Sequence, residues 1–162
     1  MAEHLERTFV ALKPDAVQRG IVGDVIKRLE RSGMRLSAMK MVQADDDILE
    51  EHYSEHVDKD FYSGLKEFMQ EGPIIAMVWE GVNAVANIRK IVGETAPKEA
   101  APGTIRGDYA HMGYAHADAT GNAVKNLIHA SGEKEEAVEE VGIWFDESEI
   151  HDYSRSDTRH VR

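Results

Sequence analysis

A continuous apolar run from Ile74 to Trp79 is the feature that most constrains the fold of this chain. Such a run, extended to Glu80, is typical of a strand in the centre of a sheet. Two further strand patterns precede it, at residues 7–13, which Pro14 ends, and at residues 34–44. A short last strand is expected at residues 142–145. The sequence therefore predicts a sheet with residues 74–80 at its centre.

Helical patterns lie between these strands. Val22, Val25, Ile26 and Leu29 follow the spacing of an amphipathic helix, and Gly33 is its expected C-cap. The other predicted helices are one that starts at Asp45-Asp46-Asp47 and runs through Leu49 and Tyr53, one that carries Phe61, Leu65, Phe68 and Met69 and ends before Gly72-Pro73, one that Asn83 caps and that runs to Val92 before Gly93, and one at residues 133–141 that Ser131 caps.

Three segments lack a helix or strand pattern. Residues 93–107 are rich in Gly, Pro, Thr and Ala and are expected to form a long loop, which in compact domains is often functional. Residues 109–121 are expected to be irregular. The polar tail, residues 146–162, is expected to lie on a neighbouring chain.

The order of these elements predicts the fold class. Strands and helices alternate with short connections, and we expect the helices to cover one face of the sheet. This order indicates an α+β sandwich with split β-α-β connections. With 162 residues and no visible linker, residues 1–162 are expected to form a single domain.

The composition excludes several kinds of function. A net charge of −11 disfavours nucleic acid as a partner, because phosphate backbones are bound by clustered Lys and Arg. No segment has the length of apolar sequence that a bilayer span or signal peptide needs, so no membrane partner and a cytoplasmic location are expected. Residues 133–152 hold nine carboxylates and one lysine, Lys134. This excess predicts either a solvated surface or adaptation to high salt, which screens repulsion among like charges.

A few residues are candidates for catalysis or phosphate binding. His129 lies between an apolar pair and Ser131, and Glu140 follows it, which suits a nucleophile with a carboxylate partner. Lys13, Arg89 and Arg106 interrupt apolar or loop segments and together could bind a transferring phosphoryl group. Each alone is typical of a structural histidine or a solvated surface cation. Neither a P-loop nor a GxGxxG motif is present.

Motifs along residues 6–144 closely resemble the nucleoside diphosphate kinase family. The most specific are the run from Pro102 to Asp108 and the run from Asn126 to Ser131. The other matching segments are Arg7-Thr8-Phe9, Leu12-Lys13-Pro14-Asp15, Val17-Gln18-Arg19-Gly20, Glu51-His52-Tyr53, Gly72-Pro73, Met77-Val78-Trp79-Glu80-Gly81, Gly93-Glu94-Thr95 and Gly142-Ile143-Trp144-Phe145.

This resemblance implies a ferredoxin-like α/β sandwich with a four-stranded antiparallel sheet, a homohexamer, and a ping-pong reaction. His129 would take the terminal phosphoryl group of a nucleoside triphosphate and pass it to a nucleoside diphosphate. Mg²⁺ would arrive on the nucleotide phosphates, with no metal site in the protein. The roles implied for the other residues are Lys13 on the sugar and transferring phosphate, Tyr53 steadying Lys13, Phe61 stacking on the base, Leu65 lining the same slot, Arg89, Thr95 and Arg106 holding phosphate oxygens, Asn126 reaching the ribose, and Ser131 and Glu140 holding and polarising His129.

Two departures from the family pattern limit this transfer of roles. The segment between Asp108 and Asn126 is several residues longer than usual, so its contacts with a base are not transferable, and His111 and His116 within it lack the spacing of a metal site. Gly132 stands where the family commonly has an aspartate. A non-catalytic nucleotide-binding or scaffold protein of the same fold is the alternative function, although such a protein has no need of a nucleophile.

Overall fold

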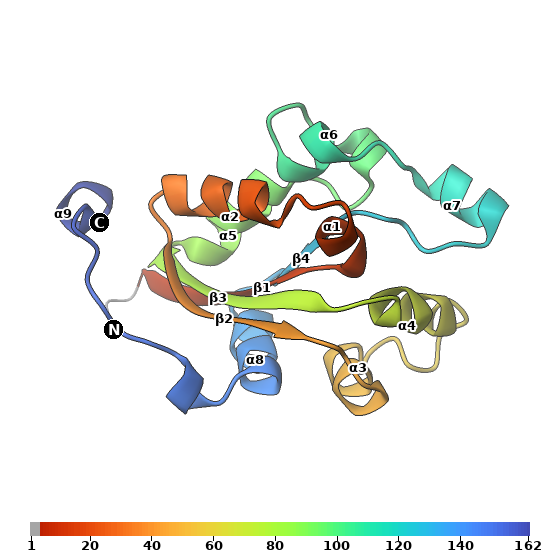
Figure 1. Cartoon of the computed structure of the whole chain (residues 1–162), viewed down its shortest axis with the longest axis horizontal. Coiled ribbons are helices and arrows are strands. Elements are labelled where there is room, and N and C mark those ends of the chain that lie inside the picture. The colour runs from red at the N-terminus through yellow and green to blue at the C-terminus, as the bar shows by residue number, and fades with distance from the viewer. Residues whose placement is uncertain (1–3) are drawn as a thin grey trace.

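The computed structural model describes residues 4–162, which form one four-stranded sheet with helices on both sides (Figure 1). The strands are β1 (Leu5–Leu12), β2 (Arg35–Val42), β3 (Ile74–Val82) and β4 (Ile128–Ala130). Their order is β2-β3-β1-β4, and every neighbouring pair is antiparallel. The predicted fold, a ferredoxin-like α+β sandwich on a four-stranded antiparallel sheet, is confirmed, with residues 74–80 inside the sheet.

The helices belong to two layers and a set of connections. Figure 1 shows α2 (Val22–Arg31) and α5 (Ala84–Val92) above the sheet, and α3 (Asp46–His52) and α8 (Lys134–Trp144) below it. Another helix, α4 (Tyr62–Gln70), lies at the same end of the molecule as α3. The remaining helical elements are α1 (Pro14–Gln18), η1 (Pro97–Glu99), α6 (Ile105–Tyr109), α7 (Tyr114–Thr120), η2 (Glu147–Glu149) and α9 (Thr158–Val161).

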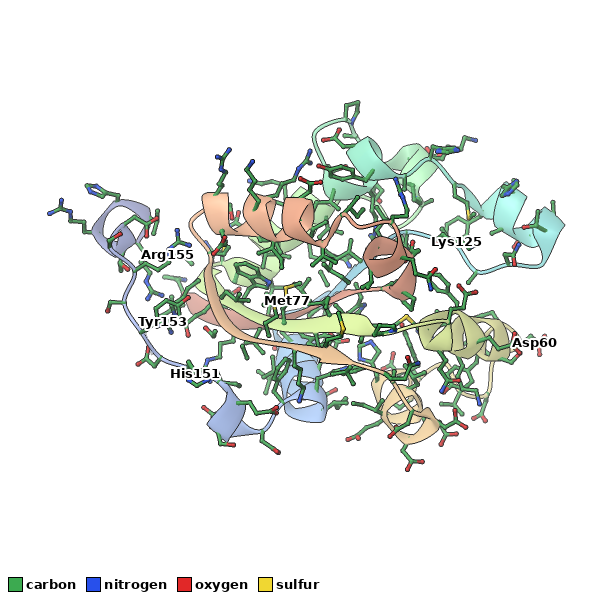
Figure 2. All side chains as sticks on the ribbon, viewed as in Figure 1. Asp60, Met77, Lys125, His151, Tyr153 and Arg155 are labelled. Carbon is green, nitrogen blue, oxygen red and sulfur yellow. The ribbon has the colours of Figure 1, made fainter. Side chains whose placement is uncertain are left out.

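Alternating side chains of β1 and β3 build two separate cores. Val10 and Met77 pack in the core beneath α2 and α5, whereas Phe9 and Val78 pack in the core against α3, α4 and α8. Figure 2 labels Met77 at the middle of the sheet. The expectation that all helices cover one face is therefore wrong: the strands are apolar in continuous runs because both of their faces are covered.

The predicted last strand is also wrong. Residues 142–144 are the end of α8, and the fourth strand is the three-residue β4, which contains His129. An apolar run of four residues fits the end of a helix as well as it fits a strand. The N-cap position of α8 is held by Glu133, so Ser131 does not cap this helix; its hydroxyl instead contacts the Phe9 backbone.

The segments without a pattern contain short helices. The predicted long loop holds η1 and the start of α6, and the segment expected to be irregular holds α7. The predicted positions of the other helices are confirmed. The Asp45 side chain caps α3 by accepting from the Ile48 amide at 2.9 Å. Asn83 occupies the N-cap of α5 in a left-handed conformation, φ 49°, and its side chain makes no cap hydrogen bond.

The polar tail lies along the chain's own edge strand. The His151 amide donates to the Ser37 carbonyl at 2.8 Å, and the Tyr153 hydroxyl donates to the Leu36 carbonyl at 2.7 Å. Arg155 reaches the Met34 carbonyl, and Figure 2 labels these three tail residues beside the sheet. Among the described residues, none of the helices combines the length and the apolar character that crossing a membrane requires.

Candidate active site

The position of His129 is fixed by backbone hydrogen bonds to the β1 segment at both ends of β4. His129 lies opposite Ala11 of β1. The Lys13 amide donates to the Leu127 carbonyl at 2.8 Å, and the Ser131 amide donates to the Phe9 carbonyl at 3.1 Å. Leu127 has φ 71°, a left-handed conformation that is uncommon for a side chain of this kind. Because strained backbone persists only where surroundings hold it, this turn is a constrained entry to the strand.

Glu140 of α8 holds the His129 ring from below. Glu140 Oε2 lies 2.6 Å from His129 Nε2 and 3.2 Å from His52 Nδ1. Trp144 donates its indole N–H to that same His52 nitrogen at 3.1 Å. The Glu140 side chain is only 5 % exposed, whereas that of His129 is 20 % exposed. With Nε2 engaged by Glu140, Nδ1 is the His129 nitrogen left for chemistry.

The surroundings keep this imidazole neutral. Burial, the positive charge of Lys13, and the charges of Arg106 and Arg89 lower the pKa of His129 to about 3, against an opposing contribution from Glu136. Burial raises the pKa of Glu140, while His52, the Ser131 hydroxyl and Arg89 lower it. Neutral imidazole is the nucleophilic form, so the site holds the reactive state at neutral pH.

Three cations stand around His129. Lys13 Nζ donates to Asn126 Oδ1 at 2.8 Å, and Asn126 Nδ2 donates to the Thr95 carbonyl at 2.9 Å. The guanidinium of Arg106, at 3 % exposure, binds backbone carbonyls of Gly93, Asn126 and Ile128. Arg89 Nη1 donates to the Ala130 carbonyl at 3.3 Å. These bonds hold the cations in place while leaving N–H groups of each for a ligand.

Burial shifts the ionisation of two of these cations. Burial, with a further contribution from Arg106, lowers the pKa of Lys13 to about 8, although Asp15 opposes the shift. Burial and the charge of Arg89 lower the pKa of Arg106 to about 10. Both groups are charged at neutral pH and are poorly solvated. An anion placed among them is therefore bound more strongly than in water.

These groups line one open cleft of about 880 Å³. The predicted residues that border it are Lys13, Tyr53, Phe61, Leu65, Arg89, Thr95, Arg106, Asn126 and His129. Lys13 and Arg106 are buried on its inner side with His129, whereas Arg89 and the Phe61 ring, which is 54 % exposed, lie on its exposed border. The structure thus brings together the residues that the sequence singled out.

Within residues 4–162, two of the predicted contacts have no hydrogen bond, that of Ser131 with His129 and that of Tyr53 with Lys13. Ser131 and Glu140 lie behind His129 and do not border the cleft. Tyr53 borders it, but within residues 4–162 no hydrogen bond joins Tyr53 to Lys13; the Tyr53 ring packs edge-on against His52 with centroids 4.5 Å apart. Burial raises the pKa of Tyr53, so its hydroxyl stays protonated.

Two parts of the site had no predicted role: His52 and the segment that contains α7. His52 belongs to the Glu51-His52-Tyr53 motif, which was a signal, but its partners Glu140 and Trp144 are distant in sequence. The segment that departs from the family pattern supplies one wall of the cleft through Tyr114, Ala117, Asp118, Gly121 and Asn122. Nothing in the composition of that segment indicated this position.

Comparison with known proteins places these features in a family. The family model described as nucleoside diphosphate kinase matches residues 6–150. A nucleoside diphosphate kinase of Natronomonas pharaonis is 50 % identical over 154 residues, 94 % of each chain, and nucleoside diphosphate kinase A of Canis lupus familiaris is 48 % identical over 148 residues, 91 % of each chain.

Solved structures of nucleoside diphosphate kinases are similar to this chain over almost its whole length. A nucleoside diphosphate kinase of Borrelia burgdorferi with bound vanadate and ADP superposes with a TM-score of 0.93 at 35 % identity, covering 99 % of this chain and 98 % of that one. A halophilic nucleoside diphosphate kinase of Halobacterium salinarum in complex with CDP gives 0.88 at 42 % identity, covering 98 % and 99 %. The chain therefore belongs to the nucleoside diphosphate kinase family, enzymes that transfer the terminal phosphoryl group of a nucleoside triphosphate to a nucleoside diphosphate.

Proposed function

We propose that the phosphoryl group passes through His129 Nδ1 in a ping-pong reaction. The observation that carries the proposal is the contact of 2.6 Å between His129 Nε2 and Glu140, which fixes the orientation and tautomer of a ring that borders the cleft and leaves Nδ1 for the reaction. Nδ1 attacks the terminal phosphorus, a P–N bond forms, and the P–O bond to the leaving nucleoside diphosphate breaks. Glu140 stabilises the positive charge that develops on the ring through the proton on Nε2. An entering diphosphate reverses these steps.

The cations are proposed to stabilise the transition state. Lys13, Arg89 and Arg106 would contact the oxygens of the transferring group, with the Thr95 hydroxyl as a further donor. Their hydrogen bonds to backbone carbonyls and to Asn126 hold them before substrate arrives, which reduces the reorganisation that the reaction requires.

The outer part of the cleft is proposed to bind the nucleoside. Phe61 would stack on the base with Leu65 beside it, and a stacking contact accepts any base because every base has a flat face. Asn126 retains one lone pair and one N–H beyond its bonds to Lys13 and Thr95, which suits a ribose hydroxyl. Tyr53 is proposed to steady the Lys13 ammonium group when nucleotide is bound.

Mg²⁺ is proposed as the cofactor, brought by the nucleotide. The cleft presents the cations Lys13, Arg89 and Arg106, and its bordering carboxylates, Asp60 and Asp118, are exposed. This donor set fits a metal ion carried on phosphate oxygens rather than one caged by protein ligands. When bound, the ion neutralises charge on the phosphates.

Several properties of the whole chain are part of the same proposal. We propose a single domain over residues 1–162, a homohexamer, and a cytoplasmic enzyme. Salt adaptation is proposed from the net charge of −11, and a relative in Halobacterium salinarum is described as halophilic.

A labelling experiment tests the role of His129. The protein is incubated with a triphosphate labelled on its terminal phosphate, and the phosphoprotein is treated with acid and with base. We expect an acid-labile, base-stable phosphate in the wild type and none in His129→Ala, which should still bind nucleotide. The matched control, His111→Ala, removes a histidine outside the cleft and should label normally. Turnover by His129→Ala would reject the proposal in favour of another nucleophile, and nucleotide binding without labelling of the wild type would favour a binding protein.

A further inference from the structure

Two imidazoles and a carboxylate converge behind the cleft. His52 of α3, His129 of β4 and Glu140 of α8 each offer one ligand atom, and these three atoms lie within 4.8 Å of one another. The side chains of His52 and Glu140 are 3 % and 5 % exposed, so water has little access to their polar atoms. Two histidines with one glutamate are a ligand set that proteins use for Zn²⁺. We call these three residues the His52 cluster.

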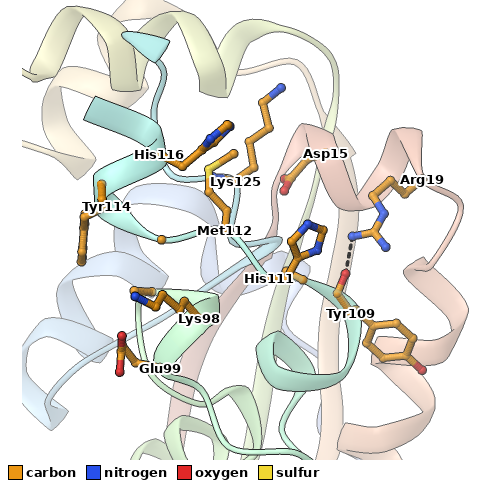
Figure 3. Close-up of a pocket in the computed structure, with 14 residues that line it drawn as sticks. Asp15, Arg19, Lys98, Glu99, Tyr109, His111, Met112, Tyr114, His116 and Lys125 are labelled. Carbon is orange, nitrogen blue, oxygen red and sulfur yellow. Dashed lines mark hydrogen bonds between the residues drawn. The ribbon is translucent and has the colours of Figure 1, made fainter. Parts of the chain in front are cut away.

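A second place where histidines gather does not form such a set. Figure 3 shows His111 and His116 on the border of a second cavity, of about 780 Å³, together with Asp15 and Arg19. In the part of the chain that the structure describes, only the His52 cluster brings three ligand atoms of this kind within 4.8 Å. The argument for a metal ion therefore concerns that cluster alone.

The hydrogen bonds of the His52 cluster compete for one ring nitrogen. His52 Nδ1 lies 3.1 Å from the Trp144 indole nitrogen, which donates, and 3.2 Å from Glu140 Oε2. A neutral ring nitrogen either accepts or donates. When Nδ1 accepts from Trp144, its lone pair faces a carboxylate oxygen without a proton between them. A cation placed among the three atoms would remove this repulsion.

Burial keeps the two rings in the form that binds metal ions. Burial, followed by the contributions of His129 and Lys13, lowers the pKa of His52 to about 3, although Glu140 opposes the shift. His129 is neutral for similar reasons. Metal ions bind neutral imidazole, so no proton has to be removed from either ring at neutral pH before an ion binds.

The distances within the cluster are close to those of a tetrahedral site. Zn²⁺ binds imidazole nitrogen and carboxylate oxygen at about 2.0–2.2 Å, which places two tetrahedral ligands about 3.3 Å apart. The 3.2 Å between Glu140 Oε2 and His52 Nδ1 fits this spacing. The 2.6 Å between Oε2 and His129 Nε2 would open by about 0.7 Å. Lys13, Arg89 and Arg106 repel a cation, so we expect weaker binding than at a structural zinc site.

We infer that the His52 cluster is an inhibitory site for Zn²⁺ and similar transition-metal ions. The inference rests on the proposed function, because it concerns the nitrogen proposed as the nucleophile. A neutral imidazole has one N–H group and one lone pair. When Zn²⁺ takes the electron pair of His129 Nε2, the proton of that nitrogen moves through solvent to Nδ1. Nδ1 then has no lone pair with which to attack phosphorus. Mg²⁺ prefers oxygen ligands and does not occupy the cluster.

Nuclear magnetic resonance of histidine-labelled protein tests the metal site directly. Metal-free, full-length protein is titrated with Zn²⁺ in the absence of nucleotide. We expect one tightly bound ion per chain, and the ¹⁵N resonance of His129 Nδ1 should change from that of an unprotonated to that of a protonated nitrogen. An Nδ1 that stays unprotonated in the zinc-loaded protein, or that itself binds the ion, would overturn the inference.

A labelling experiment measures the inhibition. Zinc-loaded protein is freed of unbound ion and mixed with magnesium and a triphosphate labelled on its terminal phosphate. We expect phosphorylation about tenfold or more slower than in the metal-free protein, with full recovery after a chelator is added. An equal rate in the zinc-loaded and metal-free proteins would contradict the inference. Absence of phosphorylation in the metal-free wild type would instead reject the proposed function, while the resonance experiment would still decide the metal site.

Variants assign the metal ion to its ligands. His52→Gln keeps the size of the side chain and removes a ligand, so zinc affinity should fall by at least about tenfold. His56→Gln changes another histidine that borders the cleft and should bind Zn²⁺ like the wild type. Wild-type zinc affinity in a folded His52→Gln protein would overturn the inference. If that variant does not fold, the resonance experiment on the wild type decides the outcome.

Discussion

Arg106 has two roles, one in the fold and one in the proposed chemistry. Its N–H groups bind three backbone carbonyls, and it borders the cleft beside His129. We expect Arg106→Ala to lower kcat/KM by roughly 10²- to 10³-fold, which is the usual loss for a preorganised donor to a transition state. The loss should be equal for ATP, GTP and UTP, because the phosphates are common to all three.

Arg28→Ala is the matched control for the structural role of Arg106. Arg28 binds the Gly103 carbonyl and Asp108 and so supports the same loop from outside the cleft. Its removal should lower the melting temperature with little change in kcat/KM. A loss in Arg106→Ala that is confined to one base would show that this guanidinium contacts the base.

The buried His52 makes the stability of the protein depend on pH in the acid range. Burial, His129 and Lys13 lower the pKa of His52 to about 3, although Glu140 raises it, and the pKa of His129 is also lowered to about 3. In the unfolded chain these groups titrate near pH 6.5. Between pH 6.5 and 3 the unfolded chain therefore binds protons that the folded protein does not, so the free energy of unfolding should fall as pH is lowered.

Substitution of His52 tests this dependence. We expect His52→Gln to reduce the slope of the free energy of unfolding against pH, between pH 6 and 4, by up to about 1.4 kcal/mol per pH unit, the contribution of one proton. The measurement is urea denaturation at several pH values. His111→Gln, which changes an exposed histidine outside the cluster, should leave the slope unchanged. Identical slopes in all three proteins would contradict the assignment.

Sequence reasoning singled out residues that the structure brings together around one cleft, but not all of their partners. His129, Lys13 and Arg106 stand out because charged or polar groups interrupt apolar runs or lie in a distinctive motif. The role of His52 depends on Trp144, 92 residues away, and becomes visible only when α3 and α8 pack side by side. Pairing across such a distance leaves no local pattern.

At the scale of elements, the length of each strand decided whether its sequence pattern predicted it. The strands β1, β2 and β3 have eight or nine residues each and carry clear patterns. Strand β4 has three residues and is held by its pairing with β1, so its own sequence does not specify it. The end of α8 contains Ile143 and Trp144, and Phe145 follows as its C-cap; this short apolar run favours a strand when read alone.

Gly93 adopts a backbone conformation that favours glycine, whereas Gly142 lies in a helix where other residues are accepted. Gly93 has φ 90°, and a Cβ there would lie 2.6 Å from Thr104 Oγ1, an atom that accepts from the Gly107 amide. We expect Gly93→Ala to destabilise the protein by about 1–3 kcal/mol and to lower kcat/KM, since the Gly93 carbonyl also holds Arg106. Gly142 lies inside α8 with open space around it, so Gly142→Ala should stabilise the protein by about 0.5–1 kcal/mol.

Denaturant titration and steady-state kinetics measure both outcomes. A Gly93→Ala protein that retains wild-type stability and activity would show that the loop relaxes around the added methyl group. A Gly142→Ala protein of lower stability would show that the open side of α8 is covered by another chain in the assembly.

At the scale of the molecule, the acidic residues of the C-terminal part divide into two groups. Glu147, Glu149 and Asp152 pair with Arg7, Lys40 and Arg35 and so fasten the tail to the sheet. Glu140 is buried against His129. The remaining five carboxylates of residues 133–152 are exposed, four of them at the start or on the surface of α8: Glu133, Glu135, Glu136, Glu139 and Asp146. The repulsive surface is therefore concentrated on α8.

Salt should stabilise this protein by screening that surface. The Debye length is about 30 Å at 0.01 M ionic strength and about 3 Å at 1 M, so repulsion across α8, and between copies in the proposed hexamer, is removed at molar salt. We expect the melting temperature to rise from millimolar to molar sodium chloride, and sedimentation to show a looser assembly at low salt.

The double variant Glu135→Gln/Glu139→Gln should melt higher than the wild type at low salt and match it at high salt. Glu50→Gln/Glu51→Gln removes two exposed charges from α3 instead and should recover less. A melting temperature and a sedimentation coefficient that stay constant over the whole range would reduce the acid excess to a solubilising surface.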